Sequence, residues 1–291
     1  MSLIEKALEK SRARAAAAVL RPAADAVPMS ALTERAAPSR SITLDFDQLL
    51  KLGMIPPLEA QRRHATQVRT IKNRLLQPIR KTGLARDRVI MVTSALSGDG
   101  KTFNTIGIAL SMATEKDYHV LLIDGDIPKP NIGQIFGIDE AGGLLDAARD
   151  AALDPEQLVI GTDLPGLYLL PAGRGGVDAA EILSSSRMHQ VIGQLAAVPN
   201  RIVLLDSAPL LLTSEATVLA QHAGQVVLVV REAVTPQRAV LDSLALLGDR
   251  PGVSLLLNGV ADSRLEEMYY GYGQDYGYGS LPAAQGAVDH E

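Results

Sequence analysis

Short runs of consecutive apolar residues, separated by longer amphipathic stretches, recur along the middle of the chain. The runs lie at residues 89–92, 120–123, 202–205, 226–230 and 254–257. They are apolar on both faces, as is typical of strands buried inside a parallel sheet. The stretches between them follow the helical period. The pattern therefore predicts an α/β fold with a doubly wound, mainly parallel sheet and flanking helices.

The chain divides into three predicted regions: residues 1–57 are an N-terminal helix and a Pro/Ala-rich linker, residues 58–262 the compact domain, and residues 263–291 a flexible tail. Ser2 and Glu5 form a capping-box pattern, which predicts a helix to about residue 20. A short helix is expected at residues 44–52. The compact domain begins with a longer helix at about residues 58–76, introduced by Pro56 and Pro57.

Two of these helices have surfaces whose role the sequence leaves open. The first has an apolar stripe, which either docks on a partner or lipid surface or has no fixed role. Its members are Leu3, Ile4, Ala7 and Leu8. The helix at residues 58–76 is strongly basic, and its charged residues include Arg62, Arg63, Arg69, Lys72 and Arg74. That face is either solvated or docks an acidic partner, a neighbouring subunit or anionic lipid headgroups.

Composition narrows the class of protein. The chain is 47% hydrophobic but only 3% aromatic, so its core must be mainly aliphatic. It contains no cysteine, which excludes disulfides, thiolate metal sites and cysteine nucleophiles. Neither a signal peptide nor a run of about 18 apolar residues is evident, so a cytoplasmic protein is expected. A formal net charge of −5 argues against general nucleic-acid binding.

A phosphate-binding loop is the clearest chemical signal in the chain. The sequence ALSGDGKT at residues 95–102 follows a predicted strand and precedes a predicted helix. Small residues let the backbone wrap round an anion, while the lysine and threonine supply a cation and a magnesium-facing hydroxyl. The residues expected to bind the nucleotide here are Ser97, Gly98, Asp99, Gly100, Lys101, Thr102 and Phe103.

Three aspartates at the ends of predicted strands complete the candidate site. Asp124 and Asp126 follow the strand at 120–123, and Asp206 follows the strand at 202–205. The carboxyl ends of parallel strands face one crevice, so all three should converge on Lys101. Magnesium prefers hard oxygen ligands, and Thr102, Asp126 and Asp206 are the expected ones. Asp124 is the chosen catalytic base, although the sequence alone does not separate its role from that of Asp126.

The C-terminal tail contains a candidate phosphate acceptor. Five of the seven tyrosines of the chain lie there among glycines: Tyr269, Tyr270, Tyr272, Tyr276 and Tyr278. Glycine gives the segment the freedom to enter an active site in several registers. A phenol with a pKa of about 10 needs a positioned base to become a nucleophile. The alternative is a low-complexity adhesive tail without modification.

These motifs together resemble the bacterial tyrosine autokinases, and most of all the branch associated with exosortase and chain-length-determinant proteins. The resemblance covers about residues 58–278 and includes ALSGDGKT, LLIDGDIPKP, LLPAGRGGVDAAEIL, LLDSAP and the tyrosine cluster. The opening MSLIEKAL is also similar to that branch. The resemblance implies a P-loop kinase that uses ATP and Mg²⁺ to phosphorylate tail tyrosines in trans within a ring of subunits.

The resemblance also implies partners and a location. The kinase would be prompted by the cytoplasmic tail of a membrane-embedded chain-length-determinant (Wzz-like) protein and would regulate polysaccharide export. It would be a homo-oligomer at the inner face of the plasma membrane, with protein tyrosines as substrates and no nucleic acid. Asn258 would lie close to the adenine.

Two other functions share parts of this pattern. A partitioning or division-site ATPase has the same sheet and paired aspartates but usually carries a lysine early in the loop, where this chain has Leu96. A non-catalytic, nucleotide-gated scaffold would not need the intact set of Lys101, Thr102 and three aspartates. The sequence therefore favours the kinase.

Overall fold

The computed structural model describes residues 38, 40–176 and 178–260. Within them eight strands form one sheet in the order β1-β4-β5-β3-β6-β2-β7-β8. Neighbouring strands are parallel except for β4 and β5, which are antiparallel. The strands are β1 (Arg40–Ile42), β2 (Val89–Ser94), β3 (His119–Gly125), β4 (Ile160–Thr162), β5 (Leu167–Leu170), β6 (Arg201–Ser207), β7 (Gln225–Arg231) and β8 (Val253–Asn258). The predicted fold class is confirmed.

All five predicted strands are present, and each is longer than its apolar run. The sequence did not predict β1, β4 and β5, because strands of three or four residues are too short to show a period. Side chains alternate between the two faces of the sheet. In β2, for example, Val89 and Met91 belong to one core cluster while Ile90 and Val92 belong to the other.

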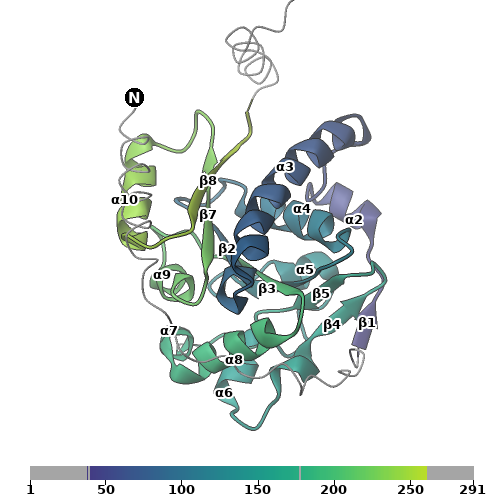
Figure 1. Ribbon diagram of the computed structural model, residues 1–291, viewed down its shortest axis with the longest axis vertical. Helices are drawn as coiled ribbons and strands as arrows, with labels where there is room; N and C mark the ends of the chain where they lie inside the picture. Colours follow the sequence, from purple (N-terminus) through teal and green to yellow (C-terminus); the bar gives the residue numbers. More distant parts are fainter. Residues whose placement is uncertain (1–37, 39, 177, 261–291) are drawn as a thin grey trace, which may run out of the picture. The chain divides into compact units, whose positions relative to one another are not determined.

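Helices cover both faces of the sheet (Figure 1). One core cluster contains residues of α3 (Leu58–Thr82), α4 (Lys101–Ala113) and α5 (Ile132–Phe136). The other contains residues of α6 (Leu144–Arg149), α7 (Ala179–Ser184), α8 (Ser186–Ala197), α9 (Ser214–Ala220) and α10 (Gln237–Leu247). The remaining helical segments are α2 (Phe46–Lys51) and the 3-10 helices η1 (Ala85–Arg88) and η2 (Pro155–Leu158).

The predicted domain boundary at residue 58 is wrong, because the sheet recruits residues that precede it. Strand β1 pairs with β4 at the edge of the sheet. The Leu44 N–H then donates to the Asp163 carboxylate at 2.9 Å, and Leu49 on α2 is 1% exposed. The short helix expected at residues 44–52 is confirmed as α2, but it packs on the domain and does not belong to a linker.

Helix α3 is longer than predicted and ends at Thr82. Pro78 lies inside it, and the helix continues past this proline because Ile79 packs in the core. The helix ends at Gly83, whose φ is +67°. Its basic face is not uniformly solvated. The Lys72 side chain is buried, and its Nζ lies 2.5 Å from the Glu115 carboxylate on the loop after α4.

No helix in the part of the chain that the structure describes is long and apolar enough to cross a membrane. The predicted N-terminal helix and the tail tyrosines lie outside the described residues.

Candidate functional site

The phosphate loop lies at the carboxyl edge of the sheet, between β2 and α4. Strand β2 lies between β6 and β7, whereas the strand that follows it in the chain, β3, lies on the far side of β6. The chain thus switches position at this point, where open α/β sheets form their binding crevice. The carboxyl ends of β2, β3 and β6 consequently surround the loop.

Two glycines of the loop have backbone angles that other residues rarely adopt: φ is +86° at Gly98 and +94° at Gly100. Gly100 is the N-cap of α4 and, as a glycine, has no side chain that could cap the helix. The first N–H groups of α4 are therefore left without a side-chain cap, as an anion-binding helix terminus requires. A phosphate group fits this arrangement.

The other loop residues hold its shape. The Asp99 side chain is almost fully buried and accepts hydrogen bonds from the Leu96 N–H at 3.1 Å and the Thr235 hydroxyl at 2.7 Å. Its carboxylate therefore braces the loop, so any contact of Asp99 with a phosphate falls to its backbone N–H. The Asn258 amide, at the end of β8, donates to the Asp99 carbonyl at 2.9 Å. The structure thus places Asn258 beside the loop.

Two side-chain pairs join the loop to the neighbouring strands. Lys101 Nζ lies 2.7 Å from a carboxylate oxygen of Asp126, just beyond β3. The Thr102 hydroxyl donates to Asp206, on β6, at 2.8 Å. The structure therefore brings together the four residues that the sequence predicts for phosphate and magnesium binding. Their roles stay predictions.

Thr105 is a site residue that the sequence pattern did not predict. Its hydroxyl lies 3.0 Å from the second carboxylate oxygen of Asp206 and also 2.8 Å from the Lys101 carbonyl. It lies three residues after Thr102, on the same face of α4. That spacing was the only available signal. Together the two hydroxyls hold Asp206 in one orientation.

Asp124 and Asp206 lie opposite each other in the register of β3 and β6, and both are fully buried. Burial, followed by the neighbouring Asp206 charge, raises the pKa of Asp124 to about 7. Burial raises the pKa of Asp206 to about 6, against the opposing effect of Lys101. Asp124 also accepts hydrogen bonds from the Ile132 N–H at 2.8 Å and the Asp126 N–H at 3.2 Å. Both of its oxygens thus orient the segment after β3.

The described residues contain no group of three or more histidines, aspartates or glutamates arranged to hold a metal ion. Hard oxygen donors are nevertheless concentrated at Thr102 and Asp206. Asp126 contacts Lys101 and not this pair. A divalent ion bound here would need phosphate oxygens and water to complete its coordination, as is common for Mg²⁺.

The fold and this site have the arrangement of the P-loop NTPase class of proteins. No family model matches the chain. It is 28% identical over 214 residues to the putative tyrosine-protein kinase EpsB of Ralstonia nicotianae and 29% identical over 194 residues to the tyrosine-protein kinase wzc of Salmonella typhi. These alignments cover 70% and 67% of this chain but 28% and 26% of the relatives. The chain thus spans about a quarter of their length.

A shorter relative and two solved structures agree with this result. The tyrosine-protein kinase YwqD of Bacillus subtilis is 29% identical over 185 residues, covering 63% of this chain and 76% of YwqD. The VpsO kinase domain is 27% identical with a TM-score of 0.59, over 70% of this chain and all of that chain. The BceF tyrosine kinase domain is 25% identical with a TM-score of 0.58, and the match covers 75% of this chain and 92% of that chain. The homologues are bacterial tyrosine-protein kinases, which confirms the predicted family resemblance. Its exosortase-associated branch stays a prediction.

Proposed function

We propose that this chain is an ATP-dependent protein-tyrosine kinase that phosphorylates the tail tyrosines of a second copy of itself. The observation that carries the proposal is the pairing of Lys101 with Asp126 and of Thr102 with Asp206 at the uncapped start of α4. The similarity to bacterial tyrosine kinases supports phosphoryl transfer to tyrosine. Leu96, in place of the lysine typical of partitioning ATPases, argues in the same direction.

The loop and α4 would hold the triphosphate of ATP. Backbone N–H groups from Ser97 to Phe103 face the phosphates, and Lys101 exchanges Asp126 for a phosphate oxygen. Thr102 and Asp206, with Asp126 as a further candidate, supply ligands for Mg²⁺, which would neutralise charge on the phosphates. Asn258 braces Asp99 from the side on which the adenine is expected.

Asp124 is the proposed base for the incoming tyrosine. A raised pKa of about 7 lets its carboxylate accept the phenol proton near neutral pH while the phenol oxygen attacks the γ-phosphorus of ATP and ADP leaves. Because both oxygens of Asp124 accept backbone N–H groups, the segment at residues 126–132 must move before the phenol can reach it. Asp126, which is 3% exposed and pairs with Lys101, remains the alternative base.

The acceptors in this proposal are Tyr269, Tyr270, Tyr272, Tyr276 and Tyr278. The further proposals follow from the resemblance: a homo-oligomer, activation by the cytoplasmic tail of a chain-length-determinant protein, and a site of action at the inner face of the plasma membrane. Regulation of polysaccharide export belongs to the same proposal.

Phosphotyrosine mapping tests this function. The purified chain, incubated with ATP and Mg²⁺ with and without the partner's tail, should gain phosphate at residues 269–278. Lys101→Ala should abolish the signal, whereas Lys116→Ala, an exposed lysine beyond the other end of α4, should leave it unchanged. Mixing Lys101→Ala with a copy whose five tail tyrosines are phenylalanine should label the Lys101→Ala copy if transfer occurs in trans.

Other outcomes contradict the proposal. Phosphate release with an unmodified tail would identify an ATPase of the partitioning type. Nucleotide binding with neither phosphate release nor labelling would identify a scaffold.

A further inference from the structure

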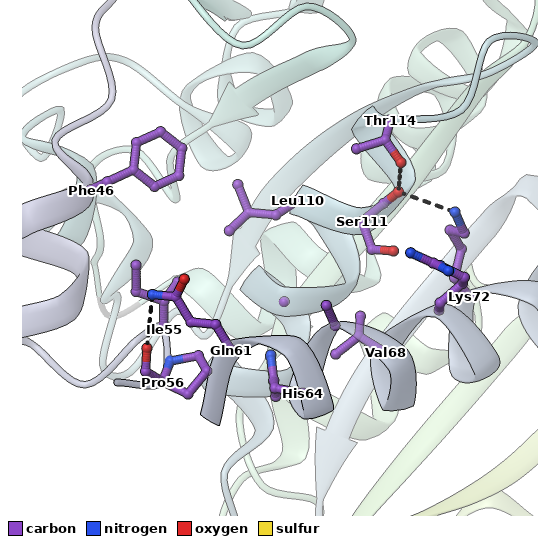
Figure 2. Close-up of a pocket in the computed structure, with 13 residues that line it drawn as sticks. Phe46, Ile55, Pro56, Gln61, His64, Val68, Lys72, Leu110, Ser111 and Thr114 are labelled. Atoms are coloured by element: carbon purple, nitrogen blue, oxygen red, sulfur yellow. Dashed lines mark hydrogen bonds between the residues drawn. The ribbon is translucent and has the colours of Figure 1, made fainter. Parts of the chain in front are cut away.

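A second cavity lies on the opposite side of α4 from the sheet. It has a volume of about 540 Å³ and lies between α2, α3 and α4 (Figure 2). Its wall is largely apolar and includes Phe46, Ile55, Val68 and Leu110. Pockets of 300–1,000 Å³ with such walls are typical binding sites. None of the proposed kinase chemistry uses this one.

Two features indicate that the cavity takes a ligand with an apolar face and a hydrogen-bonding group. Its rim continues into exposed hydrophobic side chains of α2, where Phe46 is 48% and Leu50, one turn later, 41% exposed. The Nε2 atom of His64 is buried and has no hydrogen-bond partner among the described residues. In Figure 2 the His64 side chain lies in the middle of the cavity wall.

Charged residues of opposite sign lie near the two sides of the cavity, and α2 also carries the basic Lys51 in its last turn. Exposed Asp45 and Asp47 lie on the α2 side. On the α3 side Arg69 lines the cavity, and exposed Arg62 lies two turns before it. A helix that fits must therefore have an apolar stripe with a basic edge toward α2 and an acidic edge toward α3.

The sequence at the start of this chain has that pattern. At about 100° per residue, the apolar stripe of Leu3, Ile4, Ala7 and Leu8 spans about 140° of the predicted helix. Glu5 and Glu9 fall together beyond one edge of the stripe, and Lys6 and Lys10 fall together beyond the other. Ser11 lies within the stripe and offers a hydroxyl that could pair with His64.

The connection between segment and cavity is short enough for docking within one chain. Strand β1 begins at Arg40, and the first residue of α2, Phe46, already lines the cavity. Residues 21–37 can span at most about 55–60 Å at 3.3–3.6 Å per residue. A tether of that reach gives the segment a local concentration in the millimolar range.

We propose that the N-terminal segment, residues 2–11, docks as a helix in the cavity between α2, α3 and α4 of the same chain. The docked helix would rest on α4, which begins at the phosphate loop. The cavity is joined to the first turn of α4 by a further contact, since the centroids of the His64 and Phe103 rings lie 5.1 Å apart. This inference does not depend on the proposed kinase activity.

Disulfide trapping tests the docking directly, because the full chain has no cysteine of its own. The pair Ala7→Cys and Ala65→Cys should close an intramolecular disulfide under mild oxidation. The matched control is Ala7→Cys with Gln190→Cys, on α8 at the other face of the sheet. The first pair should react at least about tenfold faster. Equal rates would overturn the proposal, and so would a disulfide-linked dimer, since it would show that a second copy fills the cavity.

A second measurement does not rely on oxidation. The chain has no tryptophan, so Leu8→Trp introduces a single tryptophan, which can be excited selectively over the seven tyrosines. Its emission should be blue-shifted and shielded from acrylamide. Glu5→Lys with Glu9→Lys should expose it, and adding Arg62→Glu with Arg69→Glu should restore the shielding. Emission typical of an exposed tryptophan in the first variant, together with equal trapping rates, would overturn the proposal.

Discussion

Two buried aspartates of the site are each held by two hydrogen bonds. Asp206 is contacted by two hydroxyls, and Asp124 by two backbone N–H groups. Such bonds favour the ionised forms, but burial and the mutual repulsion of the two carboxylates oppose them. The balance leaves both groups with a raised pKa, at about 7 for Asp124 and about 6 for Asp206. The two ionised carboxylates therefore repel each other, and a bound cation would reduce this repulsion.

These raised pKa values predict a pH-dependent stability. An acid whose pKa is raised in the folded state stabilises the fold at a pH below its pKa in the unfolded chain, which is about 4 for aspartate. This stabilisation is lost as the pH rises through the pKa of the folded state. Asp124→Asn removes the effect. The melting temperature of this variant minus that of the native chain should therefore rise by several degrees from pH 5 to pH 8. Calorimetry in EDTA without nucleotide measures both melting temperatures.

The control for this comparison is Asp117→Asn, which changes an exposed carboxylate beyond α4. Its melting temperature should follow that of the native chain at every pH. A parallel curve for Asp124→Asn would show that the Asp124 carboxylate is not strained in the folded state.

At the scale of elements, the loop between β2 and α4 is held by its contact with the end of β8. A Cβ atom added at Gly98 would meet nothing within 4 Å, whereas one at Gly100 would lie 2.1 Å from the Asn258 side-chain nitrogen. The end of β8 thus packs against the start of α4. The two glycines are needed for different reasons, since only Gly100 requires the space as well as the backbone angle.

These two positions predict different mutational costs. Gly98→Ala should cost about 1–2 kcal/mol of unfolding free energy from backbone strain alone. Gly100→Ala should cost more, because it also displaces Asn258 from its hydrogen bond to Asp99. In an Asn258→Ala background the excess should disappear, which denaturant unfolding of the four variants checks as a double-mutant cycle. Equal costs for Gly98→Ala and Gly100→Ala would contradict the packing of Asn258 on the loop.

At the scale of the whole folded unit, the sheet extends at one edge through β1 and at the other through β8. Strand β1 continues into Leu44 and α2, whose Leu49 is buried. The folded unit is therefore larger than the part that carries the phosphate loop and the aspartates. Residues 40–52 add Leu44 and Leu49 to the core, and Phe46 among them lines the second cavity.

This arrangement predicts the result of truncation. A chain that starts at residue 58 loses the burial of Leu44 and Leu49, each worth about 1.5–3 kcal/mol. It should unfold at a lower urea concentration than a chain that starts at residue 38. The chain that starts at 38 is the control for the loss of residues 1–37. Equal midpoints would mean that β1 and α2 add nothing to the stability of the sheet.

Five of the eight strands, the phosphate loop and the order of the aspartates could be predicted from the sequence alone. These features are local: an apolar run, a glycine pattern and an acid at a strand end each depend only on adjacent residues. Parallel pairing then places the strand ends at one edge, so the approximate location of the site followed as well. The roles of its residues and of the tail tyrosines remain predictions.

Which remote segments meet could be seen only in the folded structure. The sequence could not show that residues 40–42 pair with β4, that Lys72 is buried against Glu115, or that Thr105 holds Asp206. Nor could it show the cavity beside His64. Each of these depends on the packing of elements far apart in the chain, where the free energy of burial outweighs the local preference of the residues involved.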